Sequence, residues 1–363
     1  MDKNNYSIIM AGGIGSRFWP MSKPSYPKQF LDVLGMGKSL IQMTFERLCM
    51  FTPKENIYVV TNKAYRELVL EQLPLITSDQ VLCEPERKNT APCIAYAANK
   101  IYDLNPDARM VVAPSDHLIL NEGKFKHIIE VALDQSVKED CLVTLGIKPS
   151  RPDTGYGYIQ FHQDGDMIAG QVKKVKQFTE KPNLELAKIF LTSGDYYWNS
   201  GIFIWSAKSV LNALNKFKPE LNALFSCEAG KYNSDQEQEF VDAAFHNCED
   251  VSIDYAIMEN AKNVYVVLAN FDWSDLGTWG SLYTHLEKDY HGNAVIGNHV
   301  HMFDSNNCIV NMPKDKLCVI QGMNEHIVVE SDGMLMIFKK KDEQLLKEYL
   351  KKAEKMSPEF FKK

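Results

Sequence analysis

Short apolar runs alternate with helical patterns through the first 150 residues. Strands are predicted where brief runs of apolar side chains occur, at 7–10, 57–60, 110–113 and 141–145. Helices are predicted between them, near 39–51, 63–72, 90–103 and 124–137. This alternation constrains the fold strongly, because it favours a parallel sheet with right-handed crossovers. Ligands of such sheets bind beyond the carboxyl ends of the strands. We therefore expect the loops after Met10, Val60, Val112 and Leu145 to face one crevice.

The remainder of the chain changes character at about residue 289. Before it we expect strands at 156–161, 172–180, 202–205 and 264–268, with helices at 183–192 and within 207–260. After it come short β-rich runs separated by turn residues, at 300–303, 308–311, 317–320, 326–330 and 334–339. A charged helix over 342–354 closes the chain. The sequence thus predicts one large domain over 1–288 and a small, solenoid-like β-rich domain over 289–363.

The charge distribution indicates the size of the ligand. The chain has 40 basic and 47 acidic residues, a net charge of −7, which argues against binding of long nucleic acids. From Ile8 to Leu31, however, there are three cations (Arg17, Lys23 and Lys28) and no carboxylate. A local basic segment on an acidic chain predicts a small polyanion as ligand.

Nothing in the sequence predicts a membrane span or a secretory signal. No stretch approaches the roughly 18–20 apolar residues that a bilayer requires, and the first six residues are mostly polar. The eight cysteines are scattered without CxxC spacing. Reduced thiols in a cytoplasmic protein are the expectation, in preference to disulfides or a zinc site.

A glycine-rich segment follows the first strand directly, in the order Ala11, Gly12, Gly13, Ile14, Gly15, Ser16, Arg17. Glycines let backbone N–H groups approach an anion closely. The dinucleotide fingerprint fails, because Phe18 stands where its third glycine would be, and the Walker A sequence is absent. A glycine loop with Arg17 and Lys28 suits a triphosphate. The alternative is a tight turn with surface cations.

The run from Met10 to Pro20, followed by Pro27–Phe30, resembles the signature of the sugar-phosphate nucleotidyltransferases. Its Trp-Pro and Lys-Gln-Phe elements resemble the mannose-1-phosphate guanylyltransferases in particular, and further matches cover nearly the whole chain. The resemblance implies an α/β, Rossmann-like (GT-A-like) mixed-sheet domain with a C-terminal β-helical domain. It also implies the reaction of GTP with α-D-mannose 1-phosphate to GDP-mannose and pyrophosphate, assisted by Mg²⁺.

The resemblance assigns roles to the nucleotide side of the site. Arg17 and Lys28 would be catalytic, and Glu84 and Asn89 would lie by the base, although the sequence does not fix which residue contacts guanine. Read locally, Thr90 is an N-cap candidate for the following helix. Lys88 stands where the family usually has arginine. The nucleotide-binding positions implied are Ala11, Gly12, Gly13, Gly15, Ser16, Glu84, Asn89, Thr90 and Ser115.

Metal and sugar ligands are implied in the same way. Asp116, after the third predicted strand, and Asp275, in an aromatic loop, would bind the magnesium ion; locally, each could be a turn or loop residue. Glu180 and Asn199 would bind sugar hydroxyls, Lys181 the sugar phosphate, and Gly155 would give backbone contacts. Each could equally belong to a turn, an ion pair or a core edge. The segment 252–259 has core-helix spacing and receives no chemistry.

Two rival functions remain at this point. One is a nucleotidyltransferase for another nucleotide and sugar 1-phosphate, such as heptose, fucose or glucose 1-phosphate. The other is a non-catalytic regulatory subunit, although none of the expected carboxylates or loop cations is missing. Many relatives continue into an isomerase domain, for which no room follows residue 363, so we expect a monofunctional enzyme. The β-rich domain could be the interface of a homodimer.

Overall fold

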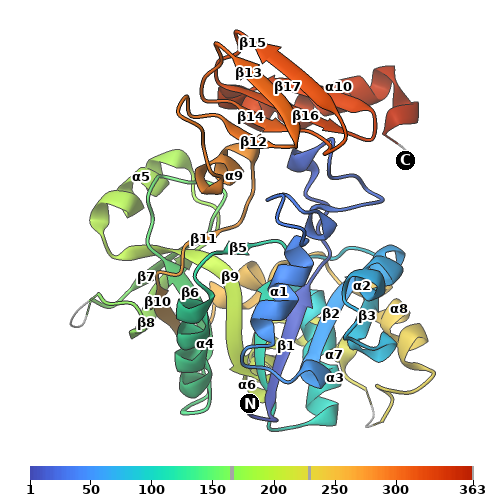
Figure 1. Ribbon diagram of the computed structural model, residues 1–363. Coiled ribbons are helices and arrows are strands. Elements are labelled where there is room, and N and C mark those ends of the chain that lie inside the picture. The colour runs from blue at the N-terminus through green and yellow to red at the C-terminus, as the bar shows by residue number, and fades with distance from the viewer. Residues whose placement is uncertain (164–166, 228–229, 362–363) are drawn as a thin grey trace. The chain divides into compact units, whose positions relative to one another are not determined.

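The computed structural model describes residues 1–163, 167–227 and 230–361 (Figure 1). By internal contacts the chain forms two compact units. Unit 1 is Met1–Gly12, Thr44–Ser115 and Ile119–Trp273; unit 2 is Gly13–Met43, Asp116–Leu118 and Ser274–Lys363. The unit that contains the C-terminal strands therefore also contains most of the glycine-rich loop. The domain border expected between residues 288 and 289 stays a prediction.

Unit 1 is built on a mixed nine-stranded sheet in the order β3-β2-β1-β4-β9-β6-β10-β8-β7. Neighbours among β1 to β4 are parallel, as the alternating pattern predicts, whereas β9 is antiparallel to both β4 and β6. The strand β3 was not among the predicted elements. The bounds are β1 Asn5–Met10, β2 Ile57–Asn62, β3 Val81–Glu84, β4 Arg109–Pro114, β6 Leu142–Ile147, β7 Tyr158–Phe161, β8 Val172–Thr179, β9 Tyr196–Ser206 and β10 Val264–Ala269.

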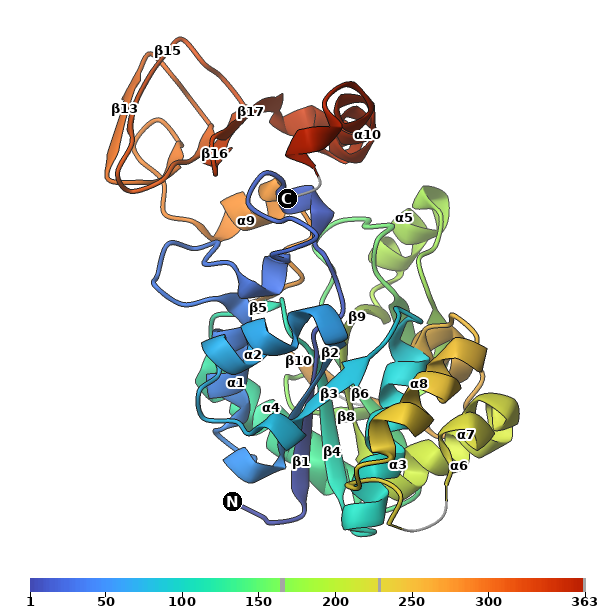
Figure 2. The same cartoon turned by 90° about the vertical axis from the view of Figure 1, so that its right-hand side faces the viewer.

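Helices cover both faces of this sheet (Figure 2). On one face α3, α6, α7 and α8 pack over alternate strand residues such as Ile8, Val60 and Val112 in a large apolar core. On the other face α4 packs across β4, β6, β8, β9 and β10. The helix bounds are α1 Leu40–Leu48, α2 Arg66–Gln72, α3 Thr90–Leu104, α4 Glu122–Ser136, α5 Leu184–Ser193, α6 Ala207–Phe217, α7 Pro219–Phe225 and α8 Glu237–Asn247.

The parallel strands bring their carboxyl ends to one edge of the sheet, where candidate site residues follow. Ala11, after β1, donates its backbone N–H to the Val60 carbonyl at 2.8 Å, and its own carbonyl accepts from Thr61 Oγ1 at 2.9 Å. Ser115, after β4, donates its backbone N–H to the Met10 carbonyl at 3.0 Å. Glu84 is the last residue of β3. The base of the glycine loop is thereby fixed to the sheet.

Unit 2 contains the expected β-solenoid. The strands β12, β14, β16 and β17 form one sheet, and β13 with β15 forms another, so consecutive strands from β12 to β16 alternate between two parallel-paired layers. A hairpin of β16 and β17 ends it. The bounds are β12 Ala294–Ile296, β13 His299–Phe303, β14 Ile309–Asn311, β15 Leu317–Gln321, β16 His326–Ser331, β17 Met334–Lys339, α9 Trp279–His285 and α10 Leu346–Met356.

The apolar core of unit 2 joins segments from opposite ends of the chain. Phe18, Leu31 and Leu40 pack with Ile309, Ile327 and other solenoid residues in one buried cluster. Burial of large apolar side chains contributes roughly 1.5–3 kcal/mol each. The loop after β1 is therefore held by the C-terminal strands rather than only by the sheet that precedes it.

Helix lengths and thiols complete the description of the fold. Within the described residues, no helix has both the length and the apolar composition needed to cross a bilayer. All eight cysteines are free thiols, and Cys83, Cys93, Cys141, Cys248 and Cys308 are buried. The reduced state expected from their scattered spacing stays a prediction.

Candidate active site

The Lys28 ammonium group organises the candidate site in unit 2. It is buried, with 3% of the side chain exposed. Its Nζ donates to Asp116 Oδ2 at 3.0 Å and to the main-chain carbonyl of Asp275 at 2.8 Å. It also lies 5.4 Å from the centre of the Phe18 ring. One cation therefore joins three of the positions that the sequence singled out separately.

Gly15 makes room for this lysine. Its φ of +67° and ψ of +39° lie in the left-handed region, and a Cβ at this position would overlap the aliphatic stem of Lys28. The Lys28 backbone N–H in turn donates to the Ile14 carbonyl at 3.0 Å. Gly13 differs, because a Cβ there would meet nothing within 4 Å. Two glycines of one loop thus have different reasons to be there.

After Gly15 the chain forms a short 3₁₀ helix, η1 (Ser16–Phe18). Phe18 is fully buried in the unit 2 core, while Ser16 and Arg17 are exposed. The loop therefore anchors on an aromatic ring and presents its guanidinium to solvent, where an anionic ligand could meet it.

Asp116 is ionised under the influence of its neighbours. Burial by itself would raise the pKa of this carboxyl, but the charges of Lys28 and His117 and the hydrogen bond from Lys28 outweigh burial. The net result is a pKa below the ordinary value. Because 31% of the side chain remains exposed, the carboxylate can still reach a ligand.

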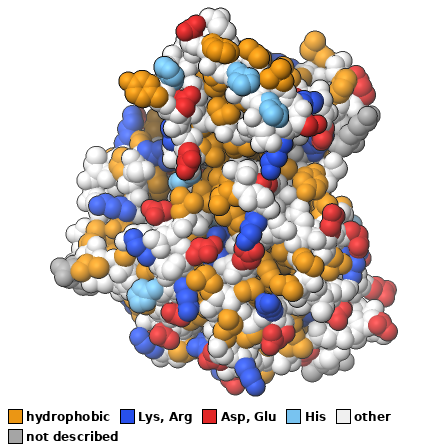
Figure 3. Space-filling view, viewed as in Figure 1, with side chains coloured by type: hydrophobic (Ala, Val, Ile, Leu, Met, Phe, Trp, Pro, Cys, Tyr) orange, Lys and Arg blue, Asp and Glu red, His pale blue; other side chains and the backbone are white. Residues whose placement is uncertain are grey.

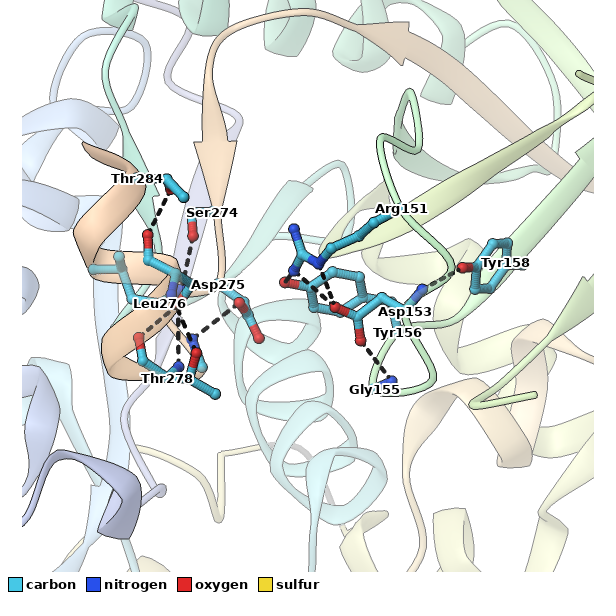
Figure 4. Close-up of polar contacts among 12 residues, drawn as sticks. Arg151, Asp153, Gly155, Tyr156, Tyr158, Ser274, Asp275, Leu276, Thr278 and Thr284 are labelled. Carbon is cyan, nitrogen blue, oxygen red and sulfur yellow. Dashed lines mark hydrogen bonds and ion pairs between the residues drawn. The ribbon is translucent and has the colours of Figure 1, made fainter. Parts of the chain in front are cut away.

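The loop that carries Asp275 is held in a strained conformation. Leu276 has a φ of +44°, uncommon for a leucine, yet its side chain is fully buried in the unit 2 core. Its N–H donates to Ser274 Oγ at 3.1 Å, and the Gly277 N–H donates to Asp275 Oδ1 at 3.0 Å (Figure 4). Thr278 then caps α9 with a capping box. Packing and these turns fix the Asp275 carbonyl opposite Lys28.

The donor set fits a hard divalent cation. Asp116 and Asp275 offer carboxylate oxygens, and both residues lie against the same ammonium group. In the part of the chain that the structure describes, no group of three or more His, Cys, Asp or Glu side chains gathers to hold a metal. Mg²⁺ is usually held by one or two carboxylates plus substrate phosphates, so two carboxylates suffice.

Glu84 is a buried carboxyl in unit 1, next to Gly12 at the start of the glycine-rich segment. Burial raises its pKa to about 7, although a hydrogen bond with Cys93 and the charge of Arg87 act in the opposite direction. Among the described residues its Oε1 atom has no hydrogen-bond partner, and Oε2 would lie 3.5 Å from a Cβ at Gly12. A buried acceptor without a partner costs roughly 1–3 kcal/mol, so this oxygen is suited to a ligand N–H.

The start of α3 differs from the sequence prediction. Asn89, not Thr90, is the N-cap, and its side chain accepts from the Thr90 N–H at 3.0 Å. The Thr90 hydroxyl instead accepts from the Ile253 N–H at 2.9 Å. Asn89 has a φ of +67° and a ψ of −167°, a region otherwise almost reserved for glycine. This strained turn is a feature that the residue pattern did not reveal.

The expected sugar-side residues form a second cluster within unit 1. Lys181 Nζ donates to Glu180 Oε1 at 2.7 Å, and the buried Asn199 donates its backbone N–H to the Gly157 carbonyl at 2.8 Å. A Cβ at Gly157 would overlap the Glu180 carboxylate. Burial lowers the pKa of Lys181, but Glu180 and Asp254 outweigh it and the net shift is upward. The carboxylate of Glu180 therefore lies between glycine backbone and a cation.

Asp254 belongs to this cluster, although its helical spacing gave no hint of chemistry. It begins a π-helical turn, η6 (Asp254–Met258), a rare conformation that is frequent at functional sites. Its Oδ1 accepts from Asn199 Nδ2 at 2.9 Å, while Asn199 Oδ1 accepts from Thr144 Oγ1 at 2.9 Å. Burial and the nearby Glu180 raise the pKa of Asp254 to about 7. Near neutral pH the Asp254 carboxyl is therefore partly protonated.

Gly155 lies in a loop organised by an arginine that the sequence analysis did not single out (Figure 4). Its N–H donates to Asp153 Oδ1 at 2.8 Å, and Asp153 Oδ2 accepts from Arg151 Nη2 at 2.7 Å. The guanidinium of Arg151 lies 5.2 Å from the centre of the Trp198 ring. The Gly155 N–H is therefore engaged within its own turn, and Arg151 is the cation that this loop presents.

The structure thus gathers the predicted residues into separate groups. Lys28, Gly15 and the two aspartates meet in unit 2, and Glu180, Lys181 and Asn199 meet in unit 1. Glu84 faces Gly12 at the sheet edge. Ser115 is buried, and its carbonyl accepts from Thr44 Oγ1 at 3.3 Å, while both backbone polar groups of Ala11 bond within unit 1. Nucleotide contacts by these two residues stay predictions.

Comparison with known proteins identifies the family. The nucleotidyl transferase family matches residues 6–291 of the chain. The chain belongs to this family. Within it, the chain is 39% identical over 355 residues to the mannose-1-phosphate guanylyltransferases of Klebsiella pneumoniae and of Escherichia coli, covering 96% of this chain and 74% of each relative. The chain therefore spans about three quarters of the length of these nucleotidyl transferases.

A solved structure supports the fold across both units. The crystal structure of a protein from Thermus thermophilus, described as a mannose-1-phosphate geranyltransferase, has a TM-score of 0.84 and 27% identity. The alignment covers 97% of this chain and 99% of that chain. The mixed sheet and the C-terminal β-rich region expected from the sequence are confirmed as features of this nucleotidyl transferase.

Substitution of Gly15 by alanine should destabilise the protein, whereas the same change at Gly13 should not. The alanine at 15 would combine a left-handed φ with overlap of the Lys28 stem, at a cost of about 2 kcal/mol or more. Chemical denaturation monitored by circular dichroism measures the difference. Equal unfolding midpoints for Gly13→Ala and Gly15→Ala would contradict the proposed reason for the glycine.

Asp254 should make stability depend on pH in a defined direction. A carboxyl whose pKa rises from its ordinary value to about 7 on folding stabilises the fold at low pH. That contribution is lost as pH increases through the window from about 4 to about 7. Asp254→Asn cannot titrate, so its melting temperature should fall less than that of the wild type between pH 5 and pH 8. Parallel pH profiles for both proteins would exclude this assignment.

Proposed function

We propose that the protein transfers GMP from GTP to α-D-mannose 1-phosphate, forming GDP-mannose and pyrophosphate. The observation that carries the proposal is the buried Lys28, bonded to Asp116 and Asp275 beside a glycine-rich loop. Such an arrangement concentrates charge where two polyanions have to meet. The names of the curated relatives at 39% identity support the choice of nucleotide and sugar.

The proposed chemistry needs no strong general base. A phosphate monoester has a second pKa of about 6, so the phosphate of the sugar is largely dianionic at neutral pH. Its oxygen can attack the α-phosphorus in line, and the bond to the leaving pyrophosphate breaks. The remaining task is electrostatic stabilisation of charge on the phosphate oxygens. Within the described residues the Lys28 ammonium has two hydrogen bonds, so its third N–H can serve a phosphate oxygen.

Nucleotidyl transferases use a divalent metal ion, and we propose that here it is Mg²⁺ held by Asp116 and Asp275. When bound, the ion would neutralise phosphate charge and help to align the reacting groups. The low pKa of Asp116 supports this role, because the carboxylate is already ionised at neutral pH.

The nucleotide would be bound through its phosphates and its base. Arg17, Lys28 and the backbone N–H groups of the glycine loop are assigned to the phosphates, with Gly12, Gly13, Gly15 and Ser16 as the loop positions. Glu84 is assigned to the guanine edge, because its buried Oε1 can accept from N1–H or the exocyclic amine. Asn89 and Thr90 would shape the adjoining turn.

The sugar phosphate would be bound by the second cluster in unit 1. Glu180 and Asn199 can bond to sugar hydroxyls, and the half-exposed Lys181 can reach a phosphate. Asp254 would act through Asn199, whose side-chain orientation it fixes at 2.9 Å. Gly155 and Arg151 lie in the loop assigned to the same substrate.

A homodimer through the β-rich region is part of the proposal. The outer face of β13 and β15 exposes Phe303, Leu317 and Val319, and Figure 3 shows hydrophobic and histidine side chains over these strands. Exposed large apolar side chains on one sheet face support a protein interface there. The free cysteines support a reducing compartment, and we propose the cytoplasm.

Pyrophosphate release tests the proposed pair of substrates. The purified protein should be assayed with Mg²⁺, four nucleoside triphosphates and the 1-phosphates of mannose, glucose, fucose and a heptose. We expect GTP with mannose 1-phosphate to give the highest kcat/KM. A strong preference for another pair would reject the specificity, and no turnover with any pair would favour a regulatory subunit.

Asp116→Asn, Asp275→Asn and Lys28→Ala should each lower kcat by about 10²–10³-fold, because each removes one preorganised charge. Circular dichroism should show that the fold is retained. Lys23→Ala is the matched control, since Lys23 lies in the same cationic segment but pairs with Asp332 at 2.7 Å. Near-normal turnover of Asp275→Asn would refute the two-carboxylate site.

A further inference from the structure

The C-terminal helix α10 lies against the glycine-loop helix η1 within unit 2 (Figure 2). Leu346 is buried, and with Leu350 it packs into the cluster that contains Phe18 and Trp19. The Trp19 ring also stacks on Phe361, with centroids 5.6 Å apart and planes at 9°. The helix is therefore docked on the loop rather than merely following the last strand.

This docking places cations beside Arg17. Lys347 and Lys351 each follow an apolar contact residue of α10 by one position, and their spacing of four puts them on one face. Both are exposed, as is Arg17. Three positive side chains thus gather at the exposed end of the glycine loop.

The described residues provide no ion-pair partner for this group of charges. Arg17, Lys347 and Lys351 form no ion pair in that part of the chain, and two acids of the same segment, Glu343 and Glu348, are engaged elsewhere. Glu343 Oε2 accepts from the Gly280 N–H at 2.7 Å, and Glu348 pairs with Lys352 at 2.7 Å. Burial, Arg17 and Lys351 together lower the pKa of Lys347, as expected for a cation among cations. Like charges without ion-pair partners on an acidic protein are suited to an anion.

We propose that Lys347 and Lys351 of α10 complete, with Arg17, a binding site for the terminal phosphates of the nucleoside triphosphate and for the pyrophosphate product. The identity of the substrate in this inference rests on the function proposed above. The proposal goes beyond that function by giving the C-terminal helix a direct part in nucleotide binding and product release.

The position of the group favours a polyphosphate over a single phosphate. Phe18 separates two sides of η1: its ring lies under the Lys28 ammonium group, while the preceding residue, Arg17, turns outward to α10. A nucleotide whose transferring phosphate binds Lys28 needs at least one more phosphate to use the cations beyond. A monophosphate has no second phosphate, so the affinity for GMP should not depend on the lysines of α10.

The test is the double variant Lys347→Ala/Lys351→Ala in the full-length protein, with Lys352→Ala as control. Lys352 lies on the same helix and has the same charge, but Glu348 already compensates it. Isothermal titration with inorganic pyrophosphate should show binding weakened about tenfold or more in the double variant and unchanged in the control. Titration with GMP should give the same affinity for all three proteins.

Two further measurements separate a binding role from a structural one. The KM for GTP should rise about tenfold in the double variant while the KM for mannose 1-phosphate stays unchanged. Its melting temperature should be equal to or above that of the wild type, because a repulsive pair is removed. Lys347→Arg/Lys351→Arg, which keeps both charges, should restore pyrophosphate binding.

Equal pyrophosphate affinity of the double variant and the wild type would overturn the proposal, as would an equal loss of GMP binding. These titrations do not depend on turnover. If the protein prefers a triphosphate other than GTP, the specificity in the proposed function fails. The α10 site still predicts that the double variant binds every triphosphate more weakly than the wild type does.

Discussion

The buried ammonium group of Lys28 is the interaction on which the candidate site of unit 2 depends. A charge with 3% exposure is stable only if it is paired, and here its partners come from positions 88 and 247 residues away along the chain. The glycine at position 15 makes room for its stem, Phe18 lies beneath it, and the strained turn at Leu276 aims a carbonyl at it. The left-handed backbone at Gly15 and at Leu276 is unfavourable for an ordinary residue, and the position of one cation explains both turns.

In the cluster of unit 1 the excess charge is negative, whereas around Lys28 a single buried cation is paired. Burial of Asp254 and the nearby charge of Glu180 raise the pKa of Asp254, and Lys181 offsets only part of that effect. The Asn199 side chain connects Asp254 to Thr144, because its amide N–H donates to Asp254 and its amide oxygen accepts from Thr144. A network of carboxyl and amide groups offers donors and acceptors in fixed directions, which is what a polyhydroxylated ligand requires. The cations of unit 2 offer charge-assisted hydrogen bonds, which are the strong contacts that phosphate oxygens make.

The sequence predicted the parallel strands and their helices well, since these depend on local apolar patterns, but it predicted long-range convergence only through family resemblance. β3 was missed because Val81–Glu84 is only four residues long and lacks a clear period. Asp254 was missed because its apolar neighbours Ala256 and Ile257 have helical spacing, and no local signal indicates a π-turn. The same limit applies to the glycine loop: the sequence does not distinguish Gly15, where a Cβ would overlap Lys28, from Gly13, where a Cβ would meet nothing within 4 Å. That difference is created by a residue from elsewhere in the fold.

Unit 2 contains both the β-solenoid and most of the glycine-rich loop, so the solenoid contributes to the candidate site. Residues of the loop after β1 share one buried core with Ile309, Ile327 and Leu346, so the loop is immobilised by strands that are synthesised almost 300 residues later. Preorganised charge is effective in catalysis only if it does not relax when the substrate binds. A glycine-rich loop is flexible by composition, and its rigidity must come from what it packs against. The solenoid and α10 supply that packing. A substitution in the buried core of the C-terminal strands should therefore alter the positions of Lys28 and Arg17, although the substituted residue contacts no substrate.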